Sequence, residues 1–344
     1  MLDQRDVSRF RSLLEASHHI VVTCHVRPDG DAMGSSIGLA SLLNTLGKEA
    51  KVITPDTPPR QLSFLPGIKE VLPFTRYPDY VRVLLKEADL IVCCDFNNFD
   101  RQEELGKIVR ETQAKKVMVD HHLYPEDFAE ITFSYPQMSS ASELMFRIIA
   151  DMGFYSEMNL DSATCLCTGI ITDTKNLTVN IQDEEIYLIM LELVKKGVDV
   201  PSIVKQVLHT KRYESIRLQA YALSNNYRIY PKHKAALVWL TLEELSKFNY
   251  EKGDTEGLVD QAGEAAGVVY TIFLREDSDC IKISTRSIYN FPVNILCEKY
   301  FQGGGHQQAA GGKFFGKMDE CISLCERVMD EFDKYLPENN PCSE

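Results

Sequence analysis

One short segment, residues 115–122, most constrains the fold of this chain. It reads Lys-Lys-Val-Met-Val and continues directly into Asp120, His121 and His122. A brief apolar run of this kind is typical of a buried strand in a parallel sheet. Open sheets of parallel strands bind their ligands at the carboxyl edge. The segment therefore predicts a parallel sheet that presents one carboxylate and two imidazoles where a ligand binds.

Strands and helices alternate through the first half of the chain. Apolar runs rich in β-branched residues predict strands at residues 19–24, 50–54, 90–94 and 116–119. The spacing of apolar residues predicts helices at residues 32–46, 80–88, 140–152 and 162–171. Because such alternation connects parallel strands through helical crossovers, it predicts an α/β fold with a doubly wound parallel sheet.

The second half of the chain has a different pattern. Residues 184–226 have helical spacing, with breaks at Gly197 and Pro201, and predict a helical connector. Beyond it, we expect strands at residues 234–240 and 280–285 and helices at residues 242–248, 292–300 and 318–335. The predicted domains are therefore a first domain at residues 1–190, a connector at 191–226 and a smaller α/β domain at 227–338.

The charge of the chain limits its partners. With 37 Lys and Arg against 50 Asp and Glu, the 344 residues carry a formal net charge of −13. An acidic protein is poorly suited to hold long nucleic acid by its backbone, because that mode needs a basic surface. A short anionic substrate remains compatible with this charge if bound cations reverse the local field.

Cysteine usage and hydropathy indicate where the protein works. The ten cysteines are scattered without paired zinc-site spacing, so we interpret them as reduced core residues. The first residues do not read as a signal peptide, and no apolar run approaches the roughly 20 residues of a membrane span. We expect a soluble cytoplasmic protein that contacts no membrane. The sequence leaves the oligomeric state open, with a homodimer as one candidate.

Four segments of the first half place Asp or His at the ends of predicted strands or helices. The residues are His25, Asp29 and Asp31, then Asp95, then Asp120, His121 and His122, and finally Asp173. Taken singly, Asp29 and Asp31 suit a turn or a helix N-cap. Asp173 is different, because an anion is unfavourable at the C-terminal end of a helix unless a cation lies nearby. Together the segments supply enough ligands for two metal ions.

In order and spacing, these segments resemble the motifs of the DHH phosphoesterase superfamily. The motifs stand here as His25-Val26-Arg27-Pro28-Asp29-Gly30-Asp31, Asp95, Asp120-His121-His122 and Thr168-Gly169-Ile170-Ile171-Thr172-Asp173. The resemblance covers nearly the whole chain and implies a two-metal site. By this resemblance, His25 and Asp29 hold one ion and Asp95 bridges both. The ligands of the other ion are Asp31, His121 and Asp173.

The resemblance also assigns roles to two side chains beside the metals. His122 faces the scissile phosphate, and Asp120 orients a ligating imidazole from the second layer of contacts. Mixed carboxylate and imidazole ligands without thiolate favour Mn²⁺, with Mg²⁺ or Co²⁺ as alternatives. Two such ions can activate a water molecule and neutralise charge on a phosphoryl oxygen. Whether His122 adds positive charge or donates a proton stays open.

A glycine-rich motif follows near the C-terminus, where Gly303, Gly304 and Gly305 lead into His306. Successive glycines let backbone N–H groups surround an anion, and a helix starting at His306 would point its positive end there. A flexible loop with a polar tip is the alternative. The segment resembles the glycine–histidine motif of the domain that accompanies many DHH phosphoesterases, which implies substrate binding. Further candidates for phosphate binding are Arg286 and Arg101.

The second half of the chain narrows the branch of the superfamily. It is unlike family II inorganic pyrophosphatases and resembles the nanoRNase and pAp phosphatase branch. That resemblance implies hydrolysis of short oligoribonucleotides, such as pApA, to mononucleotides, and conversion of 3′-phosphoadenosine 5′-phosphate (pAp) to AMP. One alternative is a single-stranded DNA exonuclease or a cyclic-dinucleotide phosphodiesterase, and another is a non-catalytic nucleotide or metal sensor. Every ligand position keeps a suitable residue, which disfavours the sensor.

Overall fold

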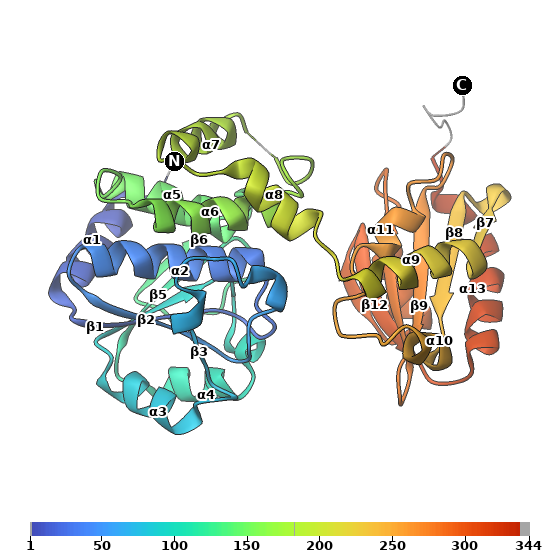
Figure 1. The fold of residues 1–344 in the computed structure, drawn as a ribbon, viewed down its shortest axis with the longest axis horizontal. Coiled ribbons are helices and arrows are strands. Elements are labelled where there is room, and N and C mark those ends of the chain that lie inside the picture. Colours follow the sequence, from blue (N-terminus) through green and yellow to red (C-terminus); the bar gives the residue numbers. More distant parts are fainter. Residues whose placement is uncertain (1, 182, 338–344) are drawn as a thin grey trace. The chain divides into compact units, whose positions relative to one another are not determined.

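The computed structural model describes residues 2–181 and 183–337, which form two compact units that divide between Thr210 and Lys211 (Figure 1). Residue 338, the last of the expected second domain, lies outside the described residues. The expected connector at residues 191–226 spans the division between the units. Its first helices belong to the first unit, and its last helix belongs to the second.

The first unit is built on a sheet of six parallel strands in the order β3-β2-β1-β4-β5-β6. The strands are β1 (His19–Thr23), β2 (Glu49–Thr54), β3 (Leu72–Pro73), β4 (Leu90–Cys94), β5 (Lys115–Asp120) and β6 (Ile131–Ser134). The order reverses between β1 and β4, where the chain winds outward in both directions. Ligands bind at such a switch point in open α/β sheets. The predicted doubly wound parallel sheet is confirmed.

Helices cover both faces of this sheet (Figure 1). One face carries α1 (Gln4–Ala16), α2 (Gly30–Thr45), α5 (Ala141–Asp151) and α6 (Leu160–Asp173), and the other carries α3 (Pro78–Glu87) and α4 (Glu104–Glu111). Outside α5 and α6 lie α7 (Glu185–Lys195) and α8 (Val200–Leu208). Alternate strand residues supply two cores, since Ile20 and Val22 pack into one and Val21 into the other. The strands are therefore apolar on both faces, as the continuous runs predicted.

Helices α2 and α6 pack at backbone contact because glycines line their interface. A methyl group built on Gly34 would lie 2.5 Å from the carbonyl oxygen of Cys165, and one on Gly30 would lie 2.3 Å from Oγ1 of Thr172. The first turn of α2 therefore meets the last turn of α6, so the two helices run antiparallel. This packing brings Asp31 on α2 close to Asp173 on α6.

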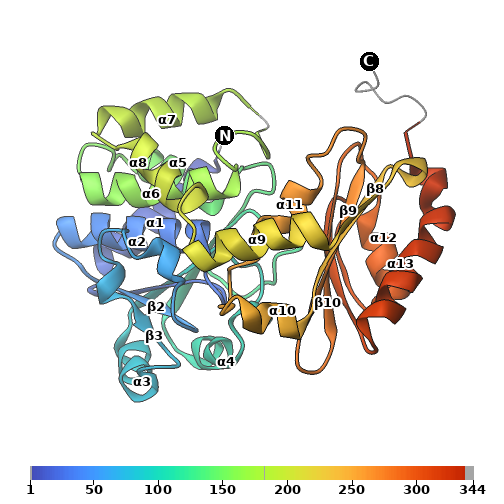
Figure 2. The ribbon, with the colours of Figure 1, turned by 45° about the vertical axis from the view of Figure 1, so that its right-hand side comes forward.

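The second unit is a mixed sheet in the order β11-β12-β10-β9-β8-β7, parallel between β8 and β9 and antiparallel elsewhere. The strands are β7 (Tyr227–Tyr230), β8 (Ala235–Leu240), β9 (Tyr270–Glu276), β10 (Ile281–Ser287), β11 (Gly304–His306) and β12 (Ala309–Phe314). Figure 2 shows helices on both sides of this sheet. One side carries α9 (Tyr213–Asn225), α10 (Leu242–Lys247) and α11 (Leu258–Ala262), and the other carries α12 (Val293–Tyr300) and α13 (Met318–Phe332). The smaller α/β domain is confirmed as a fold class.

The prediction of a helix starting at His306 is wrong. Gly304–His306 forms β11, which pairs antiparallel with β12 through Gly304–Gly311 and His306–Ala309. Gly305 has a φ of +141°, which only glycine adopts easily. The glycines therefore serve a tight strand pairing. A methyl group on Gly303 would lie 1.9 Å from the carbonyl oxygen of Gly311.

Pro201 does not break a helix either. It stands in the first turn of α8, where a backbone N–H has no partner to lose. Short 3₁₀ helices complete the described elements: η1 (Arg60–Leu62), η2 (Ile68–Glu70), η3 (Phe99–Gln102), η4 (Pro231–His233) and η5 (Asp333–Tyr335). The nine cysteines in the described ranges are buried and free, as expected. Across residues 2–181 and 183–337, no helix is long and apolar enough to cross a membrane.

Candidate metal centre

The loop after β1 and the start of α2 position the first group of predicted ligands. Asp29 is the N-cap of α2, and its Oδ1 accepts hydrogen bonds from the backbone N–H groups of Asp31 (3.1 Å) and Ala32 (3.0 Å). The N-cap interpretation of Asp29 is therefore confirmed. Nε2 of His25 lies 3.9 Å from the same Oδ1 atom. The residue that begins the helix is thus also beside the first imidazole.

Asp31 is fully buried, yet its carboxylate is held by a second helix. Its Oδ2 accepts from the backbone N–H of Ala141 at 2.6 Å, and its Oδ1 accepts from that of Ser142 at 2.8 Å. Both donors belong to the first turn of α5, where free N–H groups and the helix dipole favour an anion. Helix α5 therefore fixes the side chain that α2 carries.

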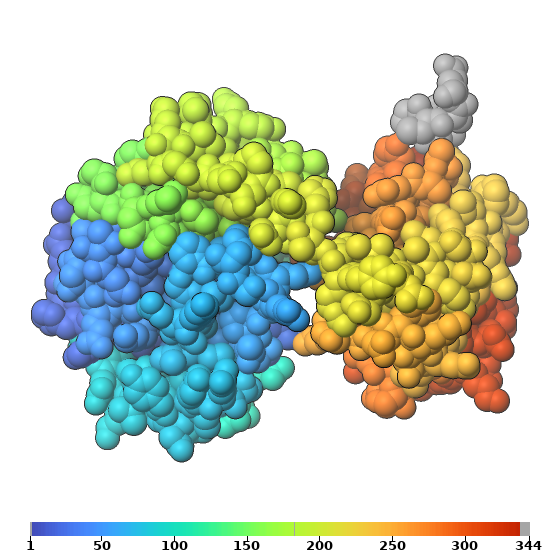
Figure 3. All heavy atoms as spheres, viewed as in Figure 1, coloured from blue at the N-terminus to red at the C-terminus, as the bar shows by residue number. Residues whose placement is uncertain are grey.

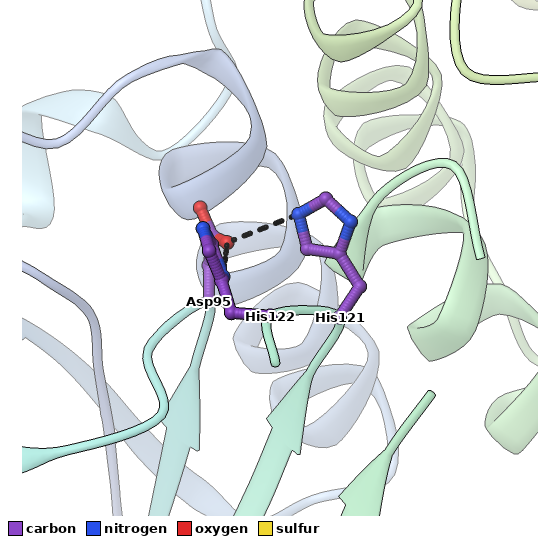
Figure 4. Close-up of side chains that lie close together, drawn as sticks. All are labelled: Asp95, His121 and His122. Atoms are coloured by element: carbon purple, nitrogen blue, oxygen red, sulfur yellow. Dashed lines mark ion pairs between the residues drawn. The ribbon is translucent and has the colours of Figure 1, made fainter. Parts of the chain in front are cut away.

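Asp95 lies at the centre of the cluster, directly after β4. Figure 4 shows His121 and His122, which follow β5, both linked to its carboxylate by ion-pair contacts. Nε2 of His121 and Nδ1 of His122 each lie 3.6 Å from Oδ1 of Asp95, and Nε2 of His25 lies 3.3 Å from its Oδ2. Oδ1 of Asp95 is buried and has no hydrogen-bond partner among the described residues. A buried carboxylate oxygen without a donor is costly, and a bound cation would remove that cost.

The histidines are held by their Nδ1 atoms. Nδ1 of His25 lies 2.8 Å from the carbonyl oxygen of Val26, and Nδ1 of His121 lies 3.3 Å from that of Met138. The Nε2 atoms of both rings therefore face the carboxylates, and that of His121 lies 3.4 Å from Oδ2 of Asp173. A second partner at Nδ1 of this kind fixes the ring of a metal-ligating histidine.

Asp120 orients His122. Its Oδ1 lies 2.8 Å from Nδ1 of His122, and its Oδ2 accepts from the backbone N–H of the same residue at 3.1 Å. Asp120 is fully buried, whereas the side chain of His122 is 30% exposed. The carboxylate therefore holds the ring that the resemblance places against the phosphate, and His121 is positioned by a backbone carbonyl instead.

The electrostatics of the cluster show strong competition among its charges. Burial and the nearby carboxylates of Asp31 and Asp95 raise the pKa of Asp173 to about 9. Burial lowers the pKa of each imidazole, but contacts with Asp95 outweigh it and raise the pKa of His25 to about 9 and that of His121 to about 10. Burial and the charge of Asp95 raise the pKa of Asp31 to about 7. Without a metal the cluster therefore keeps protons near neutral pH, and a divalent cation would replace them.

The predicted ligand residues fit two cations. In the first unit, three groups have ligand atoms within 4.8 Å of one another, namely His25 with Asp29 and Asp95, Asp31 with His121 and Asp173, and Asp95 with His121 and His122. A fourth group, His233 with Asp330 and Asp333, lies in the second unit. The first two groups contain the ligand sets implied by the resemblance. Asp95 reaches both, because its Oδ2 lies near His25 and its Oδ1 near His121. Carboxylate oxygens and imidazoles are ordinary ligands of divalent transition metals.

The remaining predicted residues lie elsewhere. Gly303, Gly304, Gly305 and His306 belong to the second unit, around β11. Arg286, on β10 in the same unit, has its Nε 3.6 Å from Oδ1 of Asp260. Arg101 is in η3 of the first unit, and its carbonyl oxygen accepts from the backbone N–H of Val26 at 2.7 Å. Arg101 therefore supports the His25 loop through its backbone.

Sequence reasoning missed the residues that act through their backbone. Met138, Ala141 and Ser142 hold His121 and Asp31 with a carbonyl oxygen and two N–H groups. Such contacts leave no mark on residue type. Each ligand segment contains, or is followed two residues later by, a non-glycine residue in the left-handed region: Arg27 (φ 54°), Asp95 (φ 60°), Tyr124 (φ 61°) and Lys175 (φ 45°). Residues with left-handed backbone are common at functional sites, but this conformation could not be predicted from the sequence.

A buried cluster of carboxylates and imidazoles at the switch point of a parallel sheet defines the class of metal-dependent hydrolases. Residues 19–170 match the N-terminal domain of the DHH family, and residues 234–331 match the DHHA1 domain. The chain therefore belongs to the DHH family of phosphoesterases, as the motifs predicted.

Known relatives are similar over most of the chain. The bifunctional oligoribonuclease and PAP phosphatase NrnA of Bacillus subtilis (strain 168) is 27% identical over 91% of this chain and 96% of its own. The protein of the same name from Thermus thermophilus is 29% identical over 90% of this chain and 88% of its own. A solved structure of an exopolyphosphatase-related protein from Bacteroides fragilis is 42% identical, with a TM-score of 0.93, over 96% of this chain and 97% of its own. The resemblance to the nanoRNase and pAp phosphatase branch is thereby confirmed.

Proposed function

We propose that this protein hydrolyses short oligoribonucleotides to mononucleotides and converts pAp to AMP. The observation that carries the proposal is the convergence of His25, Asp31, His121 and Asp173 around the carboxylate of Asp95. The similarity to oligoribonucleases with pAp phosphatase activity supports this substrate class. The net charge of −13 favours short anionic substrates over long nucleic acid.

In this proposal two divalent ions, Mn²⁺ first and Mg²⁺ or Co²⁺ as alternatives, occupy the cluster. His25 and Asp29 hold one ion and Asp95 is shared. The ligands of the second ion are Asp31, His121 and Asp173. When bound, the ions supply an activated water and charge neutralisation at the phosphoryl oxygen. The first turn of α5 holds Asp31 in place and opposes the rise of its pKa, because its N–H groups donate to both carboxylate oxygens.

His122 has a separate role that follows from its contacts. Oδ1 of Asp120 accepts from Nδ1 of His122, so Nε2 is the ring nitrogen that is left to face the substrate. A protonated Nε2 donates to the phosphate or to the leaving oxygen, which carries negative charge as the ester bond breaks. The 30% exposure of the side chain lets it reach a bound substrate.

The second unit would bind another part of the substrate. We assign this role to residues 227–338, with Gly303, Gly304, Gly305 and His306 near the substrate and Arg286 beside them. An arginine guanidinium is well shaped to bind phosphate. Arg101 of the first unit is a further candidate.

The test is a panel of pAp, pApA, a five-mer and a long single strand, each with Mn²⁺, Mg²⁺ or Co²⁺. We expect turnover of pAp and pApA, a slower reaction on the five-mer, and the loss of all activity in Asp95→Asn and His121→Ala. The matched control is Asp79→Asn, which removes an exposed carboxylate on α3 and should keep full activity.

Three results would contradict the proposal. Preference for the long strand would point to a single-stranded DNA exonuclease. Turnover of cyclic dinucleotides faster than pApA would point to a cyclic-dinucleotide phosphodiesterase. Tight nucleotide binding without product from any substrate would point to a non-catalytic sensor.

A further inference from the structure

Helix α7 is apolar on both of its faces. Its inner face is buried and packs into the core of the first unit through Ile186, Ile189, Met190 and Leu193. Its outer face exposes Tyr187 (53%), Leu188 (60%), Leu191 (49%) and Val194 (50%). In Figure 1 this helix is the outermost layer of the unit, and in Figure 3 its side chains lie at the surface. A helix that is apolar all round is normally covered on both sides.

The charges around this outer face are arranged along the helix. Glu184 and Glu185 stand at its start, and Lys195 and Lys196 stand at its end. Within the chain Glu185 pairs with Arg147, Lys195 pairs with Glu192, and Nζ of Lys196 donates to the carbonyl oxygen of Tyr155. The side chains of Glu185 and Lys195 are still 60% and 57% exposed, so both can also face a second helix. A second copy of the same helix, laid antiparallel across it, would place the acidic start of each helix beside the basic end of the other. The positive N-terminal end of each helix dipole would also lie beside the negative C-terminal end of the other, which is favourable. The face is therefore complementary to itself in charge as well as in apolar character.

We propose that the outer face of α7, defined as Tyr187, Leu188, Leu191 and Val194, is the interface of a homodimer with twofold symmetry. In an antiparallel pair centred between residues 189 and 190, Leu188 of each copy lies opposite Leu191 of the other, and Tyr187 and Val194 flank this central contact. Isologous contacts of this kind are the commonest way for identical chains to associate. The proposal does not depend on the reaction that the protein catalyses.

The first test is the molar mass of the full chain by sedimentation and light scattering. We expect twice the 39.0 kDa of one chain. Leu188→Glu and Leu191→Lys should each give a monomer, because each buries an unpaired charge against a leucine of the partner. The matched control is Val83→Glu on α3, another residue exposed to 50%, which should stay dimeric. A monomeric wild-type chain, or dimeric α7 variants, would overturn the proposal.

A mixing experiment tests the antiparallel arrangement. When the Leu188→Glu and Leu191→Lys chains are combined, one antiparallel contact places the introduced carboxylate opposite the introduced ammonium, and the other restores a leucine pair. Equal amounts of the two monomers should therefore form a heterodimer. If both variants are monomeric alone and remain so when mixed, the helices do not pair in this register.

A second observation concerns Tyr124, two residues beyond His122. It is 88% exposed and has a φ of +61°. Left-handed backbone is unfavourable for a bulky residue, and a fully exposed ring gains little from packing. The loop is nevertheless fixed, because Nδ2 of Asn97 donates to the carbonyl oxygen of Leu123 at 2.7 Å and the N–H of Glu126 donates to the carbonyl oxygen of Asn97 at 2.7 Å. The structure thus holds an aromatic ring in solvent beside the metal ligands.

The geometry points to Tyr124 as a platform on which the base of the substrate stacks. This inference rests on the proposed function. Two residues span at most about 7 Å between Cα atoms, so the backbone of Tyr124 lies within that distance of His122. Aromatic rings stack on nucleobases without requiring a particular sequence. The platform would bind the nucleoside whose phosphate lies at the metals.

Inhibition by AMP and by ribose 5-phosphate separates stacking from phosphate binding. Tyr124→Ala should raise the inhibition constant of AMP about 5- to 100-fold, because a base loses its stacking partner. It should leave the inhibition constant of ribose 5-phosphate unchanged, and Tyr124→Phe should behave as wild type. Unchanged AMP inhibition in Tyr124→Ala would overturn this inference. Absence of pAp hydrolysis by the wild-type chain would instead overturn the proposed function.

Discussion

The two sheets place their strand ends in opposite ways. In the first unit all six strands are parallel, so the residues after β1, β4 and β5 meet at one edge. In the second unit most neighbouring strands are antiparallel, so their ends alternate between two edges. Polar residues that follow strands therefore converge in the first unit and do not in the second. The comparison explains why the cluster around Asp95 forms at the carboxyl edge of the first unit's sheet.

The strongest test of this difference between the units is to remove one side chain from each unit and compare the effects on kcat and KM. Asp95→Asn should lower kcat by about 100- to 1000-fold or more, because it removes the group shared by both ligand sets. His306→Ala should raise KM by about tenfold and change kcat little, because binding is lost without loss of the reacting groups. Steady-state kinetics on pAp measure both. A fall in kcat alone for His306→Ala would place chemistry in the second unit.

Metal binding should stabilise one unit and leave the other unchanged. At about 100 times its dissociation constant, Mn²⁺ should add about 2.7 kcal/mol to the stability of the first unit. The single tryptophan, Trp239, lies on β8 and reports the second unit by fluorescence, whereas circular dichroism reports both. We expect Mn²⁺ to raise the unfolding temperature of the first unit, which circular dichroism detects. The unfolding temperature reported by Trp239 fluorescence should not change. An equal shift of the Trp239 signal would show that the units unfold together.

The glycines of the second unit should be required for the pairing of β11 with β12, whatever they add to substrate binding. Gly303→Ala should cost about 1–3 kcal/mol, because the added methyl group meets the carbonyl oxygen of Gly311 at 1.9 Å. Gly304→Ala is the matched control, since its methyl group would meet nothing closer than 3.8 Å. Chemical unfolding followed by Trp239 fluorescence compares the two. Equal stability with a shared loss of substrate affinity would favour the anion pocket instead.

The affinity for Mn²⁺ should fall as the pH falls. The pKa of His25 is raised to about 9 and that of His121 to about 10, so both rings hold a proton at neutral pH in the metal-free protein. A metal must displace these protons, and each displaced proton weakens binding about tenfold per pH unit below its pKa. Calorimetry in buffers of different ionisation enthalpy measures the protons released. Affinity that is constant between about pH 6 and pH 8 would contradict the ligand assignment.

The smallest expected effect concerns the cap of α5, whose first turn holds Asp31. Oγ of Ser140 accepts from the backbone N–H of Glu143 at 2.9 Å. Ser140→Ala should therefore cost about 1 kcal/mol of stability in the first unit. Ser12→Ala, at an exposed position within α1, is the control and should be neutral. Thermal unfolding compares the two variants: the melting temperature should fall for Ser140→Ala and stay unchanged for Ser12→Ala.

The sequence predicted the parallel sheet and the cluster because both depend on side chains. Asp95 is a lone carboxylate, yet its position after an apolar strand was enough to place it at the carboxyl edge. The amides that hold Asp31 and the exposed ring of Tyr124 were not predictable, since backbone contacts and left-handed conformation depend on tertiary packing. The glycine segment misled for the same reason. Three glycines permit both an anion-binding turn and a close strand pair, and only the partner strand β12 decides between them.

Asp29 both begins α2 and stands among the proposed ligands. A directed-evolution route toward a different metal would therefore face a structural constraint at this position. Replacement by a non-capping residue would unravel the first helical turn, which also carries Asp31, and so damage both ion sites at once. Asparagine retains the capping oxygen while removing the charge, which makes Asp29→Asn the first substitution to try.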